Sequence, residues 1–211
     1  MIIRKVNNSD LKNIVTVHQK CFPDSYSSQL NKYQWFIGSL HEQFFKEFLN
    51  DCSEIFLVCE VNNTIVGYCM GYYMDKNDQI SNFFKKNRLS LGLKTIFLLL
   101  LGNKPTWNKV LSKFDKSNKE NWEILNSRNE HILDDERGDL LSICILPEYR
   151  GSGMSKLLID SFLEAMKSQG KKLCLLSVYQ DNCRAINYYK KNGFELYRKK
   201  GNTSYTFMKL L

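Results

Sequence analysis

The spacing of hydrophobic and polar positions predicts a protein built from strands and helices in a mixed order. Short apolar runs with a period of two are typical of strands, and apolar positions three and four residues apart are typical of helices. The predicted strands cover residues 2–6, 54–61, 64–74, 139–146, 172–179, 194–201 and 204–211. The predicted helices cover residues 7–22, 26–50, 152–169 and 181–193. This order predicts a mixed sheet with helices on its faces.

The strands at 54–61 and 64–74 are expected to form a hairpin. Asn62 and Asn63 lie between them, and asparagine tolerates the left-handed backbone that a tight hairpin turn requires. Gly67 and Gly71 interrupt the second strand. Glycine inside a strand is typical of a bulge or of close approach by another backbone, so we expect one of these features here.

Residues 75–138 break this regular pattern. The segment is rich in lysine and asparagine, and its only helix-like apolar patch lies at 89–101. So few alternating positions could hardly close a core alone, so we interpret the chain as one domain, 1–211, with a mainly helical insertion at about 75–138. Net charge is +8, and residues 81–116 carry seven lysines, Arg88 and one aspartate. That local excess suggests an anionic partner near the insertion.

Cysteine usage and hydropathy limit the class of protein. The seven cysteines are an odd number and include no C-x-x-C pair, which argues against a disulfide framework and a zinc site. The chain opens without the apolar run of a secretory signal, and its most apolar stretch, at 95–102, is too short to span a bilayer. We therefore expect a soluble cytoplasmic protein with reduced thiols and no metal.

One short stretch, "LPEYRGSGMSKLL" at 146–158, carries the first chemical signal. Gly151 and Gly153 lie where an apolar strand gives way to a helix. Unpaired N–H groups and the helix dipole make such a junction an anion site, and glycine lets a phosphate approach the backbone. The alternative is a tight turn in which both glycines are needed only for the backbone conformation and bind no anion.

The surrounding residues favour the phosphate site. "CILPEYRGSGMSKLL" and, some 30 residues later, "DNCRAINYYKKNGF" resemble the GNAT superfamily of acetyl-CoA-dependent N-acetyltransferases. The family's phosphate motif is [Q/R]-x-x-G-x-[G/A], and here it runs from Arg150 to Ser155, with serine at the glycine or alanine position. The resemblance implies an α/β (α+β) fold: a mixed, mostly antiparallel central sheet with a splayed central strand pair and helices on both faces.

The resemblance also implies particular roles for residues near the two motifs. Acetyl-CoA would be the acetyl donor, and its pyrophosphate would be held by Arg150, Gly151, Ser152, Gly153, Met154, Ser155 and Lys156. Its pantetheine arm would lie along Ile143, Cys144 and Ile145, which offer backbone hydrogen bonds. Asn182 would contact the cofactor or simply cap its helix. Tyr189 matches the tyrosine that donates a proton to the departing thiolate, although it could instead be a core ring. Tyr188, expected on another helix face, is its control.

Acetyl transfer to an amine also needs a proton acceptor. Some family members use an acidic residue at the start of the motif strand, and Asp139 occupies that place. Glu60, at the end of the first hairpin strand, is a second option. Ser177 stands where other members carry a glutamate and cannot serve as a base. We therefore predict Asp139 as the base, with an exposed strand-end carboxylate as the alternative.

The acceptor is the least constrained part of the prediction. Aromatic residues in the first helices and the hairpin suit a small-molecule amine, and a nucleotide- or lipid-linked amino sugar is favoured over amino acids and polyamines. Protein N-termini or lysines, and a non-catalytic acetyl-CoA sensor, stay as alternatives. The basic segment 81–116 could meet a membrane surface or an anionic substrate. No recognised nucleic-acid motif is present. A monomer and a homodimer are both compatible with the sequence.

Overall fold

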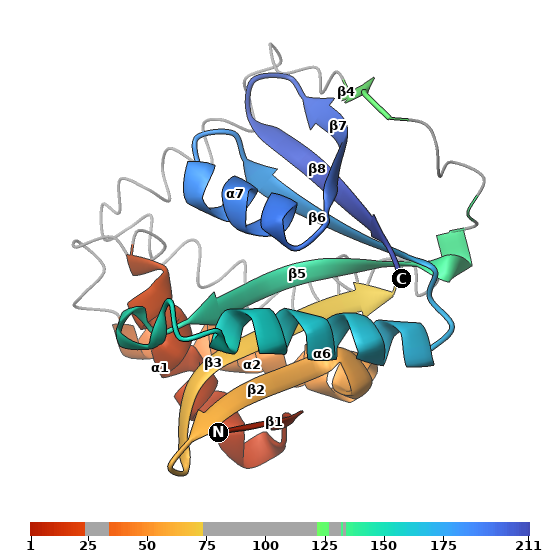
Figure 1. Cartoon of the computed structure of the whole chain (residues 1–211). Helices are drawn as coiled ribbons and strands as arrows, with labels where there is room; N and C mark the ends of the chain where they lie inside the picture. Colours follow the sequence, from red (N-terminus) through yellow and green to blue (C-terminus); the bar gives the residue numbers. More distant parts are fainter. Residues whose placement is uncertain (24–33, 74–121, 127–131, 133) are drawn as a thin grey trace.

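A computed structural model describes residues 1–23, 34–73, 122–126, 132 and 134–211 of the chain (Figure 1). The strands of the described part are β1 (Ile2–Lys5), β2 (Phe56–Val61), β3 (Thr64–Tyr73), β4 (Trp122–Ile124), β5 (Arg137–Ile145), β6 (Leu173–Tyr179), β7 (Glu195–Lys200) and β8 (Ser204–Leu210). The longer helices are α1 (Leu11–Cys21), α2 (Gln34–Cys52), α6 (Met154–Ser168) and α7 (Cys183–Lys191).

Every strand and helix predicted from hydrophobic spacing has a counterpart within these ranges. The sequence missed β4, a three-residue strand inside the segment interpreted as an insertion, which pairs with β7. The rest of the predicted helical insertion lies almost entirely outside the described residues, as does the start of the predicted helix at 26–50. Among the described helices, none is long and apolar enough to cross a membrane.

The strands form one mixed sheet in the order β1-β2-β3-β5-β6-β8-β7-β4. All neighbours are antiparallel except β5 and β6, which run parallel. Parallel neighbours need a crossover, and α6 supplies it between these two strands. The predicted mixed and mostly antiparallel sheet is confirmed.

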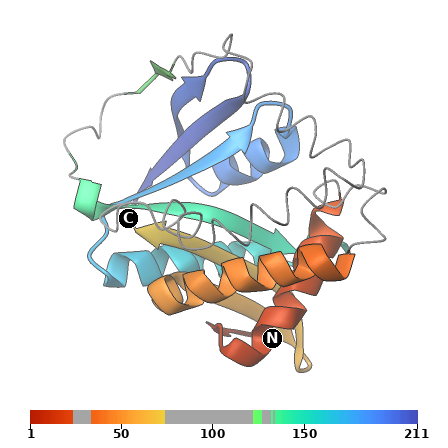
Figure 2. The ribbon, with the colours of Figure 1, turned by 180° about the vertical axis from the view of Figure 1, so that it is seen from behind.

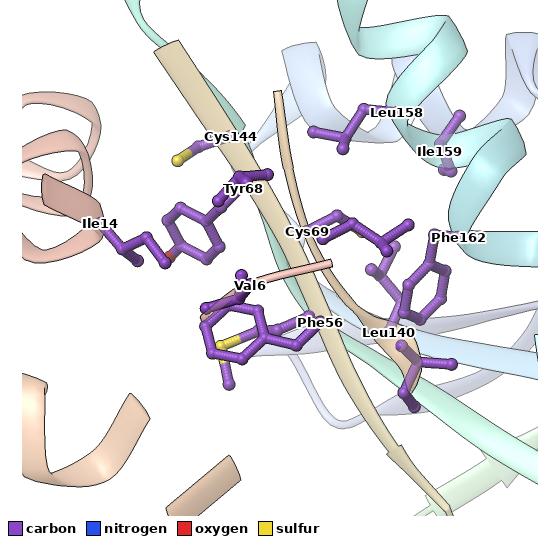
Figure 3. Packing of buried hydrophobic residues seen from close by; sticks show 14 of the residues in the cluster. Val6, Ile14, Phe56, Tyr68, Cys69, Leu140, Cys144, Leu158, Ile159 and Phe162 are labelled. Carbon is purple, nitrogen blue, oxygen red and sulfur yellow. The ribbon is translucent and has the colours of Figure 1, made fainter. Parts of the chain in front are cut away.

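Helices cover both faces of the sheet, as predicted. Figure 2, seen from behind, brings α1 and α2 in front of the sheet, whereas Figure 1 shows α6 and α7 on the opposite face. The side chains of β3 alternate between these two layers. Figure 3 shows Tyr68 packed with Ile14 and Phe56 on one side of the strand, and Cys69 facing Phe162 on the other. We call the two sides of the sheet the α1/α2 face and the α6/α7 face after these helices.

The two parallel strands separate halfway along their length. Pairing between β5 and β6 ends at Leu140 and Leu176, after which β5 continues along β3 and β6 along β8. Figure 1 shows the two strands diverging from that point. The pairing of β3 with β5 shifts register there, which leaves Leu141 as an extra residue in β5. The splayed central pair and the bulge are therefore both present.

Gly71 is part of the reason why the bulge fits. A Cβ atom at this position would lie 2.2 Å from the backbone oxygen of Asp139 and 2.6 Å from a ring carbon of Phe162. Both distances are below any normal contact, so β5 and α6 can approach β3 here only because the residue is glycine. The close approach expected at Gly71 is confirmed.

Candidate active site between the splayed strands

The separation of β5 from β6 leaves a row of backbone groups on β5 without a strand partner. Leu146 donates its N–H to the oxygen of Val66 at 2.8 Å, so every second residue of this antiparallel pair bonds to β3. By this alternation the N–H and C=O groups of Ile143 and Ile145 point toward the split, whereas those of Cys144 point toward Tyr68. The predicted pantetheine strand therefore offers two open residues, and Cys144 is not one of them.

The glycine turn lies at the end of β5, where it leads into α6. Gly151 and Gly153 have φ angles of +81° and +82°, in the left-handed region that favours glycine. An added Cβ would have nothing within 4 Å at either position, so conformation and not crowding requires glycine here. Both glycines are exposed, and the space over the turn is open.

The turn presents backbone donors at the start of α6. Among the described residues, no acceptor is found for the N–H groups from Gly151 to Ser155. Lys156 differs, because its N–H donates to the oxygen of Gly153 at 3.0 Å and its ammonium pairs with Asp160. A fifteen-residue helix adds its dipole to the open donors, which favours an anion at this end.

The side chains around the turn hold its shape. Arg150 donates its Nε–H to the oxygen of Ile145 at 3.2 Å, and the Ser152 hydroxyl donates to the oxygen of Tyr149 at 2.6 Å. Met154 packs against the core below the turn. Arg150 therefore connects the glycine turn with an open carbonyl of the predicted pantetheine strand, while its exposed guanidinium stays available to an anion.

Helix α7 begins beside β6 and carries the predicted tyrosine. Asn182 caps the helix, since its side-chain oxygen accepts the N–H of Ala185 at 3.1 Å. Tyr189, further along, packs against Tyr188 and Phe194, with ring centroids 5.5 and 5.8 Å apart. Burial raises the pKa of Tyr189 above that of a free tyrosine, and the nearby Cys69 thiol adds to the shift. Within the described part of the chain, its hydroxyl has no hydrogen-bond partner, and at neutral pH it is protonated.

Tyr188 does not behave as a distant control. Its ring packs beside that of Tyr189 against the same core, although neighbouring residues of a helix were expected on different faces. Its hydroxyl donates to the backbone oxygen of Ser155 at 2.6 Å. This bond joins α7 to the first turn of α6 across 33 residues of sequence, a connection that no local pattern indicated.

Asp139 lies on the α1/α2 face, where β5 still pairs with β6. It stands opposite Tyr72 on β3, and its carboxyl is partly buried. Burial raises the pKa of Asp139 to about 6, while the positive charge of Arg198 and a hydrogen bond from Tyr72 partly counteract the increase. A carboxyl group of this kind is ionised at neutral pH and still basic enough to accept a proton.

Arg198 is a site residue that the sequence did not single out. It lies on β7, donates its Nε–H to the Thr206 hydroxyl at 3.4 Å and stacks over the Tyr197 ring. The Ser177 hydroxyl lies 3.4 Å from the same Thr206 oxygen, so one polar row runs across three strands toward the split. Arg198 and Thr206 meet across the β7–β8 hairpin, whereas Ser177 is 29 residues from Thr206 in the sequence and joins the row only through the pairing of β6 with β8.

Glu60 is not part of this site. Its carboxylate pairs with Arg4 at 2.7 Å, and it stands opposite Ile2 on the far side of β2 from β5. The same arginine also holds Asp10, which lies at the start of α1. Glu60 is therefore one member of a structural ion-pair network near the N-terminus. It does not border the split, so it does not fit the role of the alternative base.

The predicted acid and base lie on opposite faces of the sheet. Tyr189 approaches from α7, near Cys69 and Cys174, whereas Asp139 projects to the α1/α2 face. The split between β5 and β6 borders both faces of the sheet. Among the described residues, no group of three histidine, cysteine or acidic side chains is arranged to hold a metal ion.

Comparison with known proteins identifies this arrangement. A profile of the acetyltransferase (GNAT) family matches residues 119–194, which include β5, the glycine turn, α6 and α7. This part of the chain is therefore similar to the GNAT acetyltransferases. N-alpha-acetyltransferase 30 of Schizosaccharomyces pombe is 33% identical over 63 residues, which are 30% of this chain and 42% of that protein. The chain spans less than half the length of the curated relatives it matches.

Solved structures extend the likeness to the whole chain. The PaiA N-acetyltransferase of Thermoplasma acidophilum, solved with coenzyme A, has a TM-score of 0.59 at 17% identity and covers 100% of this chain and 98% of its own. Naa20 of Chaetomium thermophilum, solved with a bisubstrate analogue, has a TM-score of 0.55 at 15% identity, with 100% and 87% covered. At these identities the likeness shows the GNAT fold, and the fold predicted from the two motifs is confirmed.

Proposed function

We propose that this protein is an N-acetyltransferase that moves an acetyl group from acetyl-CoA directly to a primary amine. The observation that carries the proposal is the split between β5 and β6, with an anion-binding turn at one end and an acid and a base on its two faces. The PaiA structure contains coenzyme A in the same fold, which supports this donor. The proposal treats residues 1–211 as one acetyltransferase domain with an insertion.

In this proposal the residues of the glycine turn bind the pyrophosphate. The open N–H groups between Gly151 and Ser155, together with the exposed Arg150 guanidinium, provide donors for its oxygens. Lys156 contributes less than the sequence suggested, because its own N–H is already bonded. The backbone groups of Ile143 and the N–H of Ile145, which have no strand partner, bind the pantetheine arm as a neighbouring strand would, while Arg150 already donates to the Ile145 oxygen.

The reaction needs two proton transfers, and Asp139 and Tyr189 each carry out one of them. Asp139 accepts the proton that the amine must lose, and Tyr189 gives its proton to the departing sulfur. A primary amine resembles lysine, with a pKa of about 10.4, so deprotonation at pH 7 costs roughly 4 to 5 kcal/mol. A carboxylate whose pKa is about 6 recovers part of that cost, while the raised pKa of Tyr189 keeps its proton available.

We propose a small-molecule amine as the acceptor, with an amino sugar as the first candidate. Arg198 supports an acceptor that carries an anionic group, because its guanidinium lies on the same face as Asp139. The basic segment 81–116, also proposed to meet an anionic substrate or membrane surface, lies outside the described residues. Tyr72, beside Asp139, supplies an aromatic surface at the same place.

A protein N-terminus is the second candidate acceptor. The name of one relative, N-alpha-acetyltransferase 30, favours it. The α-amino group has a pKa near 8, so its deprotonation at pH 7 costs only about 1 to 1.5 kcal/mol and demands less of the base. A peptide acceptor therefore fits a site whose base has a pKa of about 6.

The test is a thiol-release assay with acetyl-CoA and a panel of acceptors. The panel holds amino sugars, their nucleotide-linked forms, amino acids, polyamines and short peptides with free N-termini. We expect turnover with wild type and a large loss in Tyr189→Phe. Turnover with peptides alone would replace the first candidate by the second. Coenzyme A binding without turnover on any amine would instead indicate an acetyl-CoA sensor.

A further inference from the structure

Two thiols meet next to the proposed cofactor site. Cys21 is the last residue of α1, and Cys144 lies on β5 between Ile143 and Ile145. Helix α1 packs against β5, and the two thiols lie within hydrogen-bonding reach of one another. Figure 3 shows the Cys144 sulfur on the side of the strands that faces α1. The contact depends on the packing of α1 against the sheet, because the two residues are far apart in the sequence.

Solvent reaches one thiol of this pair but not the other. Cys21 is half-buried, whereas Cys144 is 9% exposed and belongs to the apolar core. All seven cysteines of the chain lie in its described part, and of the remaining five only Cys183 is exposed. An oxidant dissolved in water therefore reaches Cys21 directly and oxidises Cys144 only through it.

The two thiols differ in how readily they ionise. The hydrogen bond from Cys144 lowers the pKa of Cys21, and the positive charge of Arg150 adds to the decrease, while burial and the Glu148 carboxylate oppose it. Burial, together with the nearby Cys21, raises the pKa of Cys144 well above that of a free thiol. Oxidants react with the thiolate, so Cys21 is the thiol that reacts first and Cys144 is the one that follows.

The pair adjoins residues proposed to bind coenzyme A. Arg150, which contacts the Cys21 thiol, also donates its Nε–H to the Ile145 oxygen at 3.2 Å. Cys144 is held in β5 by its pairing with Tyr68 on β3, so a bond between the two sulfurs draws the end of α1 toward β5. Arg150 then loses one of the two groups that orient it. Because Arg150 is proposed to bind the pyrophosphate, the bond should weaken the hold on the cofactor.

We propose that Cys21 and Cys144 form a redox switch, in which a peroxide joins them as a disulfide and thereby weakens the binding of coenzyme A. The inference rests on the proposed cofactor site and goes beyond the transfer reaction, which uses neither thiol. The sequence gave no sign of such a pair, because an odd number of scattered cysteines without a C-x-x-C pair does not indicate which of them meet.

The oxidation balances in two steps. The Cys21 thiolate attacks one oxygen of hydrogen peroxide, the O–O bond breaks, and the released hydroxide takes up a proton, which leaves a sulfenic acid and one water. The Cys144 sulfur then attacks the Cys21 sulfur, so the S–S bond forms and the S–O bond breaks. The hydroxide leaves with the proton of Cys144 as a second water. The two thiols lose two electrons and the peroxide gains them, and dithiothreitol reverses the bond by thiol–disulfide exchange.

The switch is tested by treating the reduced chain with hydrogen peroxide. Peptide mass mapping without reductant locates the disulfide, and calorimetry measures the Kd of coenzyme A. We expect a bond between Cys21 and Cys144 and a Kd raised about fivefold, the effect of one lost hydrogen bond. Dithiothreitol should restore both. The oxidised chain should unfold at a temperature about 5 to 10 °C higher, because the disulfide closes a long loop.

Three cysteine variants separate the pair from other thiols. Cys21→Ser and Cys144→Ala each remove one sulfur of the pair, and both should abolish the effect of peroxide on the Kd. Each variant is compared with its own reduced form, so a change in basal affinity does not enter the result. Cys183→Ser is the matched control, because it removes an exposed thiol at the start of α7. It should keep the full response to peroxide. If Cys144→Ala does not fold, Cys21→Ser decides by the same criterion.

The outcomes distinguish the switch from the proposed function. If peroxide forms no bond between Cys21 and Cys144, or if the bond leaves the Kd within twofold, the switch is overturned and the acetyltransferase proposal stays intact. A full response in Cys21→Ser overturns the switch as well. A Kd that responds as expected, without turnover on any amine, supports the switch and overturns the proposed function. Absence of coenzyme A binding by the reduced chain overturns both.

Discussion

The two faces of the split differ in how the chain builds them. On the α6/α7 face, the proposed cofactor site uses backbone N–H groups of one continuous turn and a tyrosine on the next helix. On the α1/α2 face, the proposed acceptor site uses side chains from separate elements, among them Tyr72, Asp139 and Arg198. The first is a local feature of about forty residues, whereas the second exists only once the sheet has formed.

This difference follows from what each site must recognise. A diphosphate binds to main-chain donors, so the sequence needs only glycines that allow the required φ angles. An acceptor amine must be recognised by shape and charge, which requires side chains of chosen type at separated positions. The cofactor face can therefore stay similar among relatives while the acceptor face varies. Variants on the two faces should accordingly affect different kinetic constants.

Tyr189→Phe is expected to have the largest effect on catalysis. Loss of the proposed proton donor should lower kcat by about a hundredfold, the lower range for a positioned acid. Coenzyme A affinity should stay within twofold, because the ring contacts with Tyr188 and Phe194 remain. Steady-state kinetics and calorimetry measure the two quantities. A large loss of coenzyme A affinity with unchanged kcat would mean that Tyr189 binds the cofactor. The proton donor would then not be Tyr189.

Asp139→Asn tests the α1/α2 face through pH. The wild-type rate should fall as pH drops below about 6, since protonation of the carboxylate removes the base. The variant should lose about tenfold in kcat at pH 7 and show no such limb. Rate profiles between pH 5 and 8 provide the measurement. An unchanged acid limb in the variant would mean that another group titrates there.

The same substitution should stabilise the folded protein. Burial raises the pKa of Asp139 from 3.8 to about 6, so the folded state binds more protons than the unfolded state between these values. Stability must then fall as pH rises through this interval, by up to about 3 kcal/mol. Asparagine carries no such penalty. Chemical denaturation at pH 4 and pH 7 should show a smaller pH-dependent loss in Asp139→Asn than in wild type.

The sequence predicted the α6/α7 face better than the α1/α2 face, and the reason is physical. A glycine turn and a helix cap depend on local backbone requirements. Neighbouring residues alone therefore predicted the places of Gly151, Gly153 and Asn182. Arg198 carries no local signature, because strand order and register decide what it faces. Strand β4 was missed for a related reason: three residues show no period, and pairing with β7 makes them a strand.

Gly153→Ala should affect the cofactor face without touching the acceptor face. Forcing a Cβ into the left-handed region costs about 1 to 2 kcal/mol, and relaxation of the turn would turn its N–H groups away from the anion. We expect about tenfold weaker binding of coenzyme A, measured by calorimetry. Gly170→Ala is the matched control, because Gly170 has a φ of +76° and lies just beyond the other end of the same helix. It should cost similar stability and leave affinity unchanged.

Tyr188→Phe should have the smallest effect on coenzyme A binding, and it tests which of the two tyrosines donates the proton. It removes the hydrogen bond to the Ser155 oxygen while keeping the ring beside Tyr189. Such a bond contributes about 1 kcal/mol, which corresponds to roughly fivefold weaker coenzyme A binding if it holds the first turn of α6 in place. The kcat should stay within twofold of wild type. The reverse result, a lower kcat with unchanged affinity, would make Tyr188 the proton donor, because its hydroxyl is the one already directed at the proposed anion-binding turn.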